Sequence, residues 1–165
     1  MIYVITVISG KELDTAATLR KMGYEAYVPR MLKRYRKSKE VHYIAQVMFD
    51  GYVFVNIPYG LNADDYYKIK DINYVGNFLS RNICLSDTES EYIKALCNKG
   101  EVIGVSKGIL ENGFLKITEG WLKNFEHKIV SCSARQHKAT VELTIYEKTH
   151  RVVCSVDIEK AQRQE

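Results

Sequence analysis

The most constraining feature of this 165-residue sequence is a change of hydrophobic pattern across a glycine-containing stretch. Before residue 100, apolar segments of strand type alternate with segments whose apolar residues recur at helical spacing. After residue 112 the apolar residues recur at every second position, as in half-buried strands. The pattern predicts two modules, residues 1–99 and 113–165, joined by a linker at residues 100–112.

The first module is expected to be a mixed α+β domain. The segment Ile2–Ile8 is rich in β-branched residues and apolar on both faces, as a central strand covered on both sides would be. Ser9 and Glu12 have the spacing of a capping box, which predicts a helix that ends before Gly23. Strands are expected at 24–29, 51–55 and 74–79, and helices at 62–70 and from a second capping box, Ser86 and Glu89, to Gly100.

The second module is expected to be a small β-barrel. Its apolar residues fall into four groups at strand spacing: Leu115 and Ile117; Val130 and Cys132; Val141, Leu143 and Ile145; and Val152, Cys154 and Val156. Four or five such strands in about 50 residues cannot cover both faces of a flat sheet, so a curled barrel is the economical solution.

Several classes of protein are disfavoured by the composition. The apolar runs are too short to span a bilayer and no signal peptide is recognisable, so a cytoplasmic protein is expected. The cysteines lack metal-ligand or redox spacing and are expected to be reduced, buried thiols: Cys84, Cys97, Cys132 and Cys154. The four histidines show no zinc spacing and no nucleophile motif is present, so neither a metal, a cofactor nor an enzymatic activity is expected.

A basic segment stands out against a net charge of only +4. Residues 30–39 contain six of the 24 Lys and Arg residues and no acidic residue. Residues 30–49 are expected to form a protruding hairpin or loop that returns to the sheet. Such a block is either a solvated loop or a phosphate-binding segment, and the residues expected near nucleic acid are Lys33, Arg34, Arg36 and Lys37.

The order of short motifs along the chain resembles the NusG family. Ile2–Gly10 resembles the opening W-Y-V strand and S-G helix start of its amino-terminal (NGN) domain, and Glu25–Arg30 resembles the second strand. Met48–Val55 resembles the F-P-G-Y-V signature, and Asn73–Leu79 takes the place of the V-x-G-F-I segment. Leu115–Phe125 resembles the start of a KOW motif, which implies a KOW barrel after an NGN domain and a flexible linker.

Departures from the family pattern suggest a specialised paralogue. Ile2 replaces the usual Trp, Asp50 replaces a Pro, His127 stands where KOW motifs usually have Gly, and Gly120-Trp121 replaces a Gly-Pro pair. The segment from Gly120 to Glu126, with the later run Ala134–Glu142, is most similar to the LoaP group of bacterial processive antiterminators, which recognise an RNA hairpin in the leader transcript.

The resemblance implies a polymerase-binding surface in the first module. NGN domains bind the clamp helices of the largest polymerase subunit, and the matching aromatic residues here are Tyr3, Phe49 and Tyr52. The alternative for Phe49 and Tyr52 is that both are ordinary core aromatics. Gly51, between them, is expected to serve close backbone approach or a bulge and to make no contact of its own.

The resemblance also implies an RNA-binding surface in the barrel. The residues expected there lie at strand ends or in loops: Lys123, His127, Lys128, Arg135, His137 and Lys138. Without the resemblance they would be read as a solvated rim. Loops nevertheless suit a hairpin reader, which needs cations at phosphates and a few side chains at splayed bases.

Two other functions stay open at this stage. The barrel could instead bind a protein, either a small-subunit ribosomal protein or the termination factor Rho, with Phe125 as the natural contact. Alternatively, the chain could be a ribosome-associated RNA-binding protein that does not touch polymerase. In each case a monomer without membrane association is expected.

Overall fold

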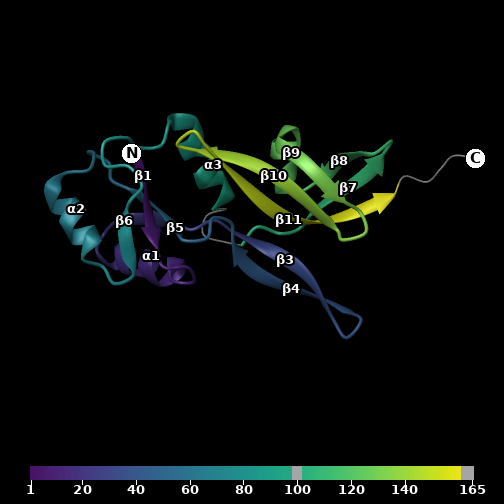
Figure 1. The fold of residues 1–165 in the computed structure, drawn as a ribbon, viewed down its shortest axis with the longest axis horizontal. Coiled ribbons are helices and arrows are strands. Elements are labelled where there is room, and N and C mark those ends of the chain that lie inside the picture. Colours follow the sequence, from purple (N-terminus) through teal and green to yellow (C-terminus); the bar gives the residue numbers. More distant parts are fainter. Residues whose placement is uncertain (98–101, 161–165) are drawn as a thin grey trace, which may run out of the picture. The chain divides into compact units, whose positions relative to one another are not determined.

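The computed structural model describes residues 1–97 and 102–160 and divides the chain into two compact units (Figure 1). The first unit contains Met1–Pro29 and Val47–Glu101, and the second contains Arg30–Gln46 and Val102–Glu165. The sequence pattern assigns the segment 30–46 to the first module, whereas its contacts group it with the second unit. The expected α+β class is confirmed.

A four-stranded sheet forms the centre of the first unit. Its strands are β1 (Ile2–Val7), β2 (Glu25–Tyr27), β5 (Tyr52–Asn56) and β6 (Val75–Phe78), in the order β2-β5-β1-β6. All neighbouring pairs are antiparallel. The inner position of β1 confirms the expectation of a central strand, and its burial on both faces explains why the sequence is continuously apolar.

The two faces of this sheet are covered differently. On one face, the odd-numbered residues of β1 pack against α1 (Glu12–Lys21), through Ala16 and Leu19, and against α2 (Ala63–Lys70), through Tyr66 and Ile69. The other face carries the even-numbered residues, and its buried members are Ile2, Val4 and Phe54. The third helix, α3 (Asp87–Leu96), buries Ile93 and Leu96.

The helix starts confirm one expected capping box and contradict the other. Ser86 and Glu89 form the reciprocal box at the start of α3, and α2 begins where Asn62 accepts the backbone N–H of Asp65 at 2.8 Å. The expected box of Ser9 and Glu12 is wrong. The N-cap of α1 is Lys11, which makes no side-chain cap bond. Glu12 instead points into the protein, because it has a partner in a distant turn.

The second unit contains a five-stranded sheet in the order β8-β7-β11-β10-β9. Its strands are β7 (Ser106–Glu111), β8 (Phe114–Glu119), β9 (Ile129–Ser133), β10 (Lys138–Ile145) and β11 (Lys148–Lys160). A 3-10 helix, η2 (Trp121–Lys128), connects β8 to β9. Strands β8 and β9 are the two edge strands of this sheet. Because both line the same groove, the sheet is curled so that its edges face each other.

The expected alternation in this unit is confirmed for its inner strands and fails at an edge. Val141, Leu143 and Ile145 of β10 are fully buried, and the alternating group on β11 is at most 3% exposed: Val152, Cys154 and Val156. Val130 is 51% exposed, although the pattern assigns it to the interior. The reason is that β9 is an edge strand, where period-two spacing does not guarantee that either face is covered.

Strand β7 occupies most of the described part of the expected linker. Asn112 and Gly113 both have positive φ, and they form the tight turn of a β7–β8 hairpin, for which Asn-Gly is a strong signal. Gly108 does not mark flexibility: a Cβ there would lie 2.9 Å from the Lys116 carbonyl oxygen, so the glycine permits close strand approach. A close strand contact therefore explains Gly108, and a tight turn explains Gly113.

Candidate functional site

The three aromatic residues predicted to bind polymerase do not share one surface. Tyr3 is paired with Val55 across β1 and β5, whereas Tyr52 is paired with Thr6. Because side chains alternate between faces, Tyr3 and Tyr52 point to opposite faces of the sheet. Tyr3 is 5% exposed and belongs to the core beneath α1 and α2.

Phe49 is also a core residue in this structure. It is 4% exposed, and its ring packs edge-on against Phe54 with the centroids 5.5 Å apart. Tyr52 is only partly buried, and its backbone N–H donates to the Phe49 carbonyl oxygen at 3.1 Å. Of the three predicted residues, Tyr52 is thus the one whose side chain is offered at the surface.

The turn before Tyr52 is held by a residue whose role the sequence did not reveal. Glu12 is 2% exposed, and its Oε1 accepts the backbone N–H of Gly51 at 2.7 Å. The Gly51 carbonyl accepts the N–H of Val7 at 2.8 Å. The expectation that Gly51 makes no contact is therefore wrong. Its φ of +74° also requires glycine, since L side chains rarely adopt that conformation.

A further bond ties this turn to the start of the first helix. The Ser9 hydroxyl donates to the Asp50 carboxylate at 2.6 Å. Asp50 stands where the family signature has proline, and proline could not accept this bond. The departure from the signature therefore has a local structural use, and Ser9 and Glu12 both serve the turn at Asp50 and Gly51 rather than a capping box.

Exposed apolar residues adjoin Tyr52 at this end of the sheet. Ile8, just after β1, is 61% exposed. Its backbone N–H donates to the carbonyl oxygen of Tyr74, a residue that is 46% exposed. Thr6, opposite Tyr52, is partly exposed. We call Thr6, Ile8 and Tyr52 the Tyr52 surface; the ring of Tyr74 lies on the α1 side, where the Lys11 ammonium is 4.9 Å from its centre. Sequence reasoning missed Ile8 because it is the last residue of an apolar run, whose end cannot be located from composition alone.

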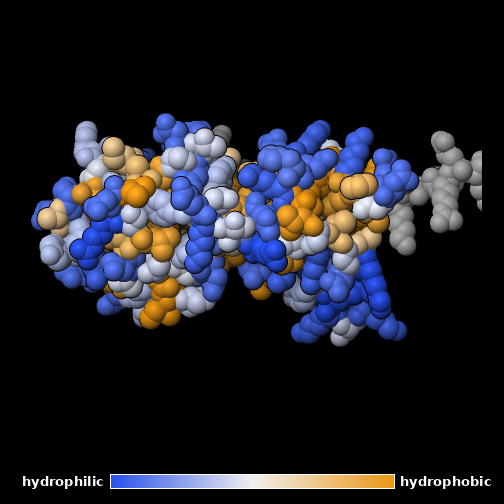
Figure 2. Space-filling view, turned by 45° about the horizontal axis from the view of Figure 1, so that its top comes forward, coloured by the Kyte–Doolittle hydropathy of each residue, from blue (hydrophilic) through white to orange (hydrophobic). Residues whose placement is uncertain are grey.

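The predicted basic segment forms strand β3 (Arg30–Lys37) of a two-stranded hairpin with β4 (Glu40–Val47). Ser38 and Lys39, both with positive φ, make its turn. The hairpin projects from the five-stranded sheet and is mainly hydrophilic (Figures 1 and 2). Tyr35 stacks on His42 across the two strands, with centroids 5.4 Å apart.

The base of the hairpin is attached to the second unit. The N–H of Arg34 donates to the Ser155 hydroxyl of β11 at 2.8 Å, and Met31 forms a bridge with Ile103. Strand alternation places Arg34 and Arg36 on one face of the hairpin and Lys33 and Lys37 on the other. The four predicted cations therefore form two pairs that face opposite directions.

The predicted RNA-binding residues also divide into two groups. Lys123, His127 and Lys128 lie in η2, immediately before β9. Arg135, His137 and Lys138 lie in or next to the turn after β9. A five-residue strand, about 17 Å long at a rise near 3.3 Å per residue, separates the groups.

The protein-binding alternative rests on Phe125, which is partly buried. Its ring lies 5.6 Å from the ring of Trp121, in an edge-on arrangement within η2. His137 is also partly buried, and its Nδ1 has no hydrogen-bond partner within residues 1–97 and 102–160. Neither residue is as accessible as Lys123 of η2, which is exposed.

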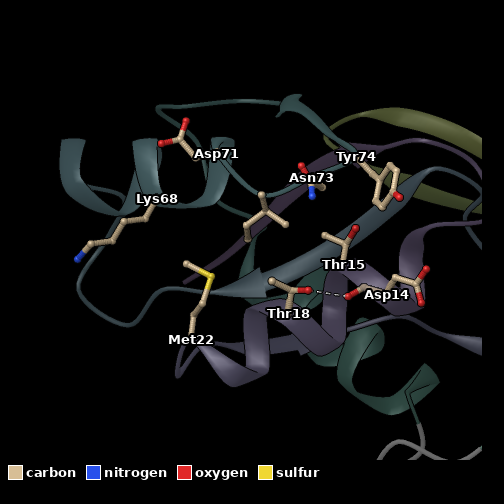
Figure 3. A pocket seen from close by; sticks show the side chains of 9 residues that line it. Asp14, Thr15, Thr18, Met22, Lys68, Asp71, Asn73 and Tyr74 are labelled. Atoms are coloured by element: carbon tan, nitrogen blue, oxygen red, sulfur yellow. Dashed lines mark hydrogen bonds between the residues drawn. The ribbon is translucent and has the colours of Figure 1, made fainter.

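A pocket of about 460 Å³ lies in the first unit, between α1 and the segment that follows α2 (Figure 3). The Thr15 hydroxyl on its α1 side is buried without a partner in the described residues. Thr18 donates to the Asp14 carbonyl at 3.0 Å, and the Lys11 ammonium, near the pocket, lies 4.9 Å from the centre of the Tyr74 ring. The lining offers no nucleophile hydrogen-bonded to a base, which an acyl-transfer site would require.

The cysteines are free thiols in the described residues. Cys97 and Cys154 are buried, and burial raises the pKa of the Cys154 thiol to about 12. Cys84 and Cys132 are only partly buried, so the expectation of buried thiols holds for two of the four. No cluster of three potential metal ligands is present among the residues that the structure describes. In the same residues, no helix combines the length and apolar character needed to cross a membrane.

Comparison with known proteins identifies the family of the first unit. The family model "NusG: Transcription termination factor nusG" matches residues 2–94. A solved structure, the MjSpt4:Spt5 complex in conformation A, is similar to 94% of this chain and 99% of its own, at 14% identity and a TM-score of 0.35. No curated protein sequence gives a significant match.

Proposed function

The chain belongs to the NusG family, and we propose that it is a bacterial processive antitermination factor that binds RNA polymerase with its first unit and a leader RNA hairpin with its second. NusG-family proteins are non-enzymatic transcription factors. This membership places the chain in transcription elongation. The antiterminator role and the RNA partner are the parts that we add.

The single observation that carries the polymerase contact is the match over residues 2–94, which includes every strand of the first unit's sheet. Within that span, the Tyr52 surface offers exposed apolar groups beside a turn held by buried Glu12. A rigid apolar surface of this kind suits an amphipathic helix, and the clamp helices of the largest polymerase subunit are the partner we propose.

The RNA contact is supported by charge and position. Lys123, His127 and Lys128 stand together in η2, next to a groove, and the resemblance of this part of the chain to a KOW motif favours a role in recruitment. The resemblance to the LoaP group supports RNA as the recruited partner. An NGN domain followed by a KOW domain is part of the proposal, with β7 assigned to the second of them.

Transcription by purified RNA polymerase tests the proposed function. The leader sequence is first identified by crosslinking the protein to RNA in cells and sequencing that RNA. Two templates are then made, one with the intact leader before a terminator and one in which the leader hairpin is scrambled. We expect the protein to increase terminator readthrough on the intact leader only. Equal readthrough on both leaders would exclude leader recognition, and a requirement for Rho or a ribosomal protein would favour the protein-partner alternative through Phe125.

Neutralising the β3 cations should weaken association with the elongation complex mainly at low salt. Removing one phosphate interaction should reduce the slope of log affinity against log salt by about 0.9 or less. Because Arg34 and Arg36 face away from Lys33 and Lys37, one strand of nucleic acid can contact only one pair. Glutamine substitutions in the two pairs are therefore expected to have unequal effects, measured by binding at several salt concentrations.

Equal effects of the two double substitutions would contradict the assignment of these cations to phosphate contacts. Equal weakening by the two double substitutions at every salt concentration would indicate damage to the hairpin rather than the removal of phosphate interactions. The melting temperature of each variant is the control for folding. It should not change, because the hydrogen bond from Arg34 to the Ser155 hydroxyl is donated by the backbone N–H and survives the side-chain substitution.

A further inference from the structure

A groove of about 990 Å³ opens between the two edges of the five-stranded sheet. One wall contains Phe114 and Leu115 at the start of β8, and the other contains Ile129–Cys132 of β9. Lys123 and His127 of η2 also line it. Its volume lies at the upper end of the range of ligand pockets, about 300–1,000 Å³, and accommodates a nucleotide.

Phe114 is the unusual residue of this groove. It is 81% exposed and is held directly after the tight turn at Asn112 and Gly113, opposite Glu111. A large aromatic side chain normally contributes to stability by burial, and at this exposure it contributes little. Val130, on the facing strand, is 51% exposed, so apolar groups are exposed on both sides. Figure 2 shows apolar side chains gathered on the visible face of this unit.

The charges beside Phe114 favour an anionic occupant. Lys123 and His127 are exposed at the groove, and Lys128 follows them. Among the described residues, the one carboxylate in the lining is that of Glu126, which accepts the backbone N–H of Ile117 at 3.0 Å. Glu126 therefore has a partner within the protein, and at neutral pH the cations Lys123 and Lys128, the latter just outside the lining, outnumber it by two to one.

We propose that this groove binds an unpaired RNA nucleotide, whose base stacks on Phe114 while its flanking phosphates lie near Lys123 and His127. An aromatic face beside cations is the arrangement by which proteins hold unstacked bases. The inference rests on the proposed RNA contact and deepens it. It assigns the base to Phe114 and separates this site from Arg135 and Lys138, which lie beyond the far end of β9.

The test uses the full-length chain and two fluorescent probes, an oligoadenylate and an abasic oligoribonucleotide of equal length. The abasic chain keeps the phosphates and lacks the bases. Phe114→Ala should lower affinity for oligoadenylate by about five- to 150-fold, the range that stacking one base on an aromatic residue provides. It should leave affinity for the abasic chain unchanged. Lys123→Gln should weaken the binding of both probes, because both carry phosphates.

Two further variants separate stacking from general apolar contact. Phe114→Tyr keeps the aromatic face and should retain binding. Tyr59→Ala removes an aromatic residue of the first unit that is 99% exposed, and it should have no effect. Since Phe114 is largely outside the core, its variants should melt at the temperature of the parent.

The results that overturn the inference are distinct from failure of the proposed function. If the parent protein binds oligoadenylate no better than the abasic chain, or does not bind it, no stacking site exists in the groove. If Phe114→Ala and Tyr59→Ala weaken binding equally, the effect is not local to the groove. In either case, the readthrough experiment on intact and scrambled leaders still tests leader recognition, because its outcome does not depend on a stacking site at Phe114.

Discussion

Replacing Phe49 by alanine is expected to destabilise the first unit by about 3–5 kcal/mol, the usual cost of truncating a buried aromatic residue. Phe49 is 4% exposed and packs edge-on against Phe54, so its removal leaves a cavity beside the second face of the sheet. Folded domains are stable by only about 5–15 kcal/mol, so this destabilisation is a large part of the total. Loss of polymerase binding would then follow from unfolding.

Denaturant unfolding followed by circular dichroism measures this effect. Phe49→Leu is the matched control, because it keeps most of the apolar contact with Phe54 and should lose less stability. A Phe49→Ala protein that unfolds at the denaturant concentration of the parent, yet fails to bind polymerase, would contradict the core assignment. It would return Phe49 to the binding surface, where the family resemblance places it.

The sequence predicts the first unit well where local signals agree with the fold. The run Ile2–Ile8 contains β1, and the capping box of Ser86 and Glu89 starts α3. These signals act within a few residues, so no tertiary information is needed to read them. The same holds for the alternation in β10, where three buried residues at period two identify one face of a strand.

Local signals fail where a polar side chain has a distant partner. Ser9 and Glu12 have the spacing of a capping box, but they bond to Asp50 and Gly51, about 40 positions away along the chain. Burial removes the Glu12 side chain from water, and the hydrogen bond that its Oε1 accepts from the Gly51 N–H offsets part of that cost. No spacing rule within one helix can report such a contact, although it fixes the turn before Tyr52.

The sequence shows which residue types the candidate sites contain, but it does not show which of those residues share a surface. Aromatic residues at Tyr3 and Tyr52 are visible in the sequence, but their opposite directions follow from the register of β1 with β5. Likewise, the cations of η2 were identified, whereas Phe114 was not. Its importance comes from its exposure and from the curl that brings β8 and β9 to one groove. Exposure depends on the whole fold.

The register of β1 with β5 also decides which aromatic substitution can separate binding from folding. Tyr3 lies in the core beneath α1 and α2, so its truncation would report on stability, as with Phe49. Tyr52 is partly exposed, and its backbone is positioned by the turn at Gly51. A change confined to the Tyr52 side chain leaves the bond between Glu12 and Gly51 in place.

Tyr52→Ala is therefore expected to weaken polymerase binding by about 2 kcal/mol or more, roughly 30-fold, as truncation of an aromatic hot spot does. The melting temperature should stay near that of the parent. Affinity for purified polymerase is the measurement, with Tyr67→Ala as the control. Tyr67 is 63% exposed on α2, the helix that packs on the opposite face of the sheet. A folded Tyr52→Ala protein that binds and stimulates polymerase like the parent would exclude the Tyr52 surface. Equal weakening in both variants would exclude it as well, because the effect would then not be specific to that face.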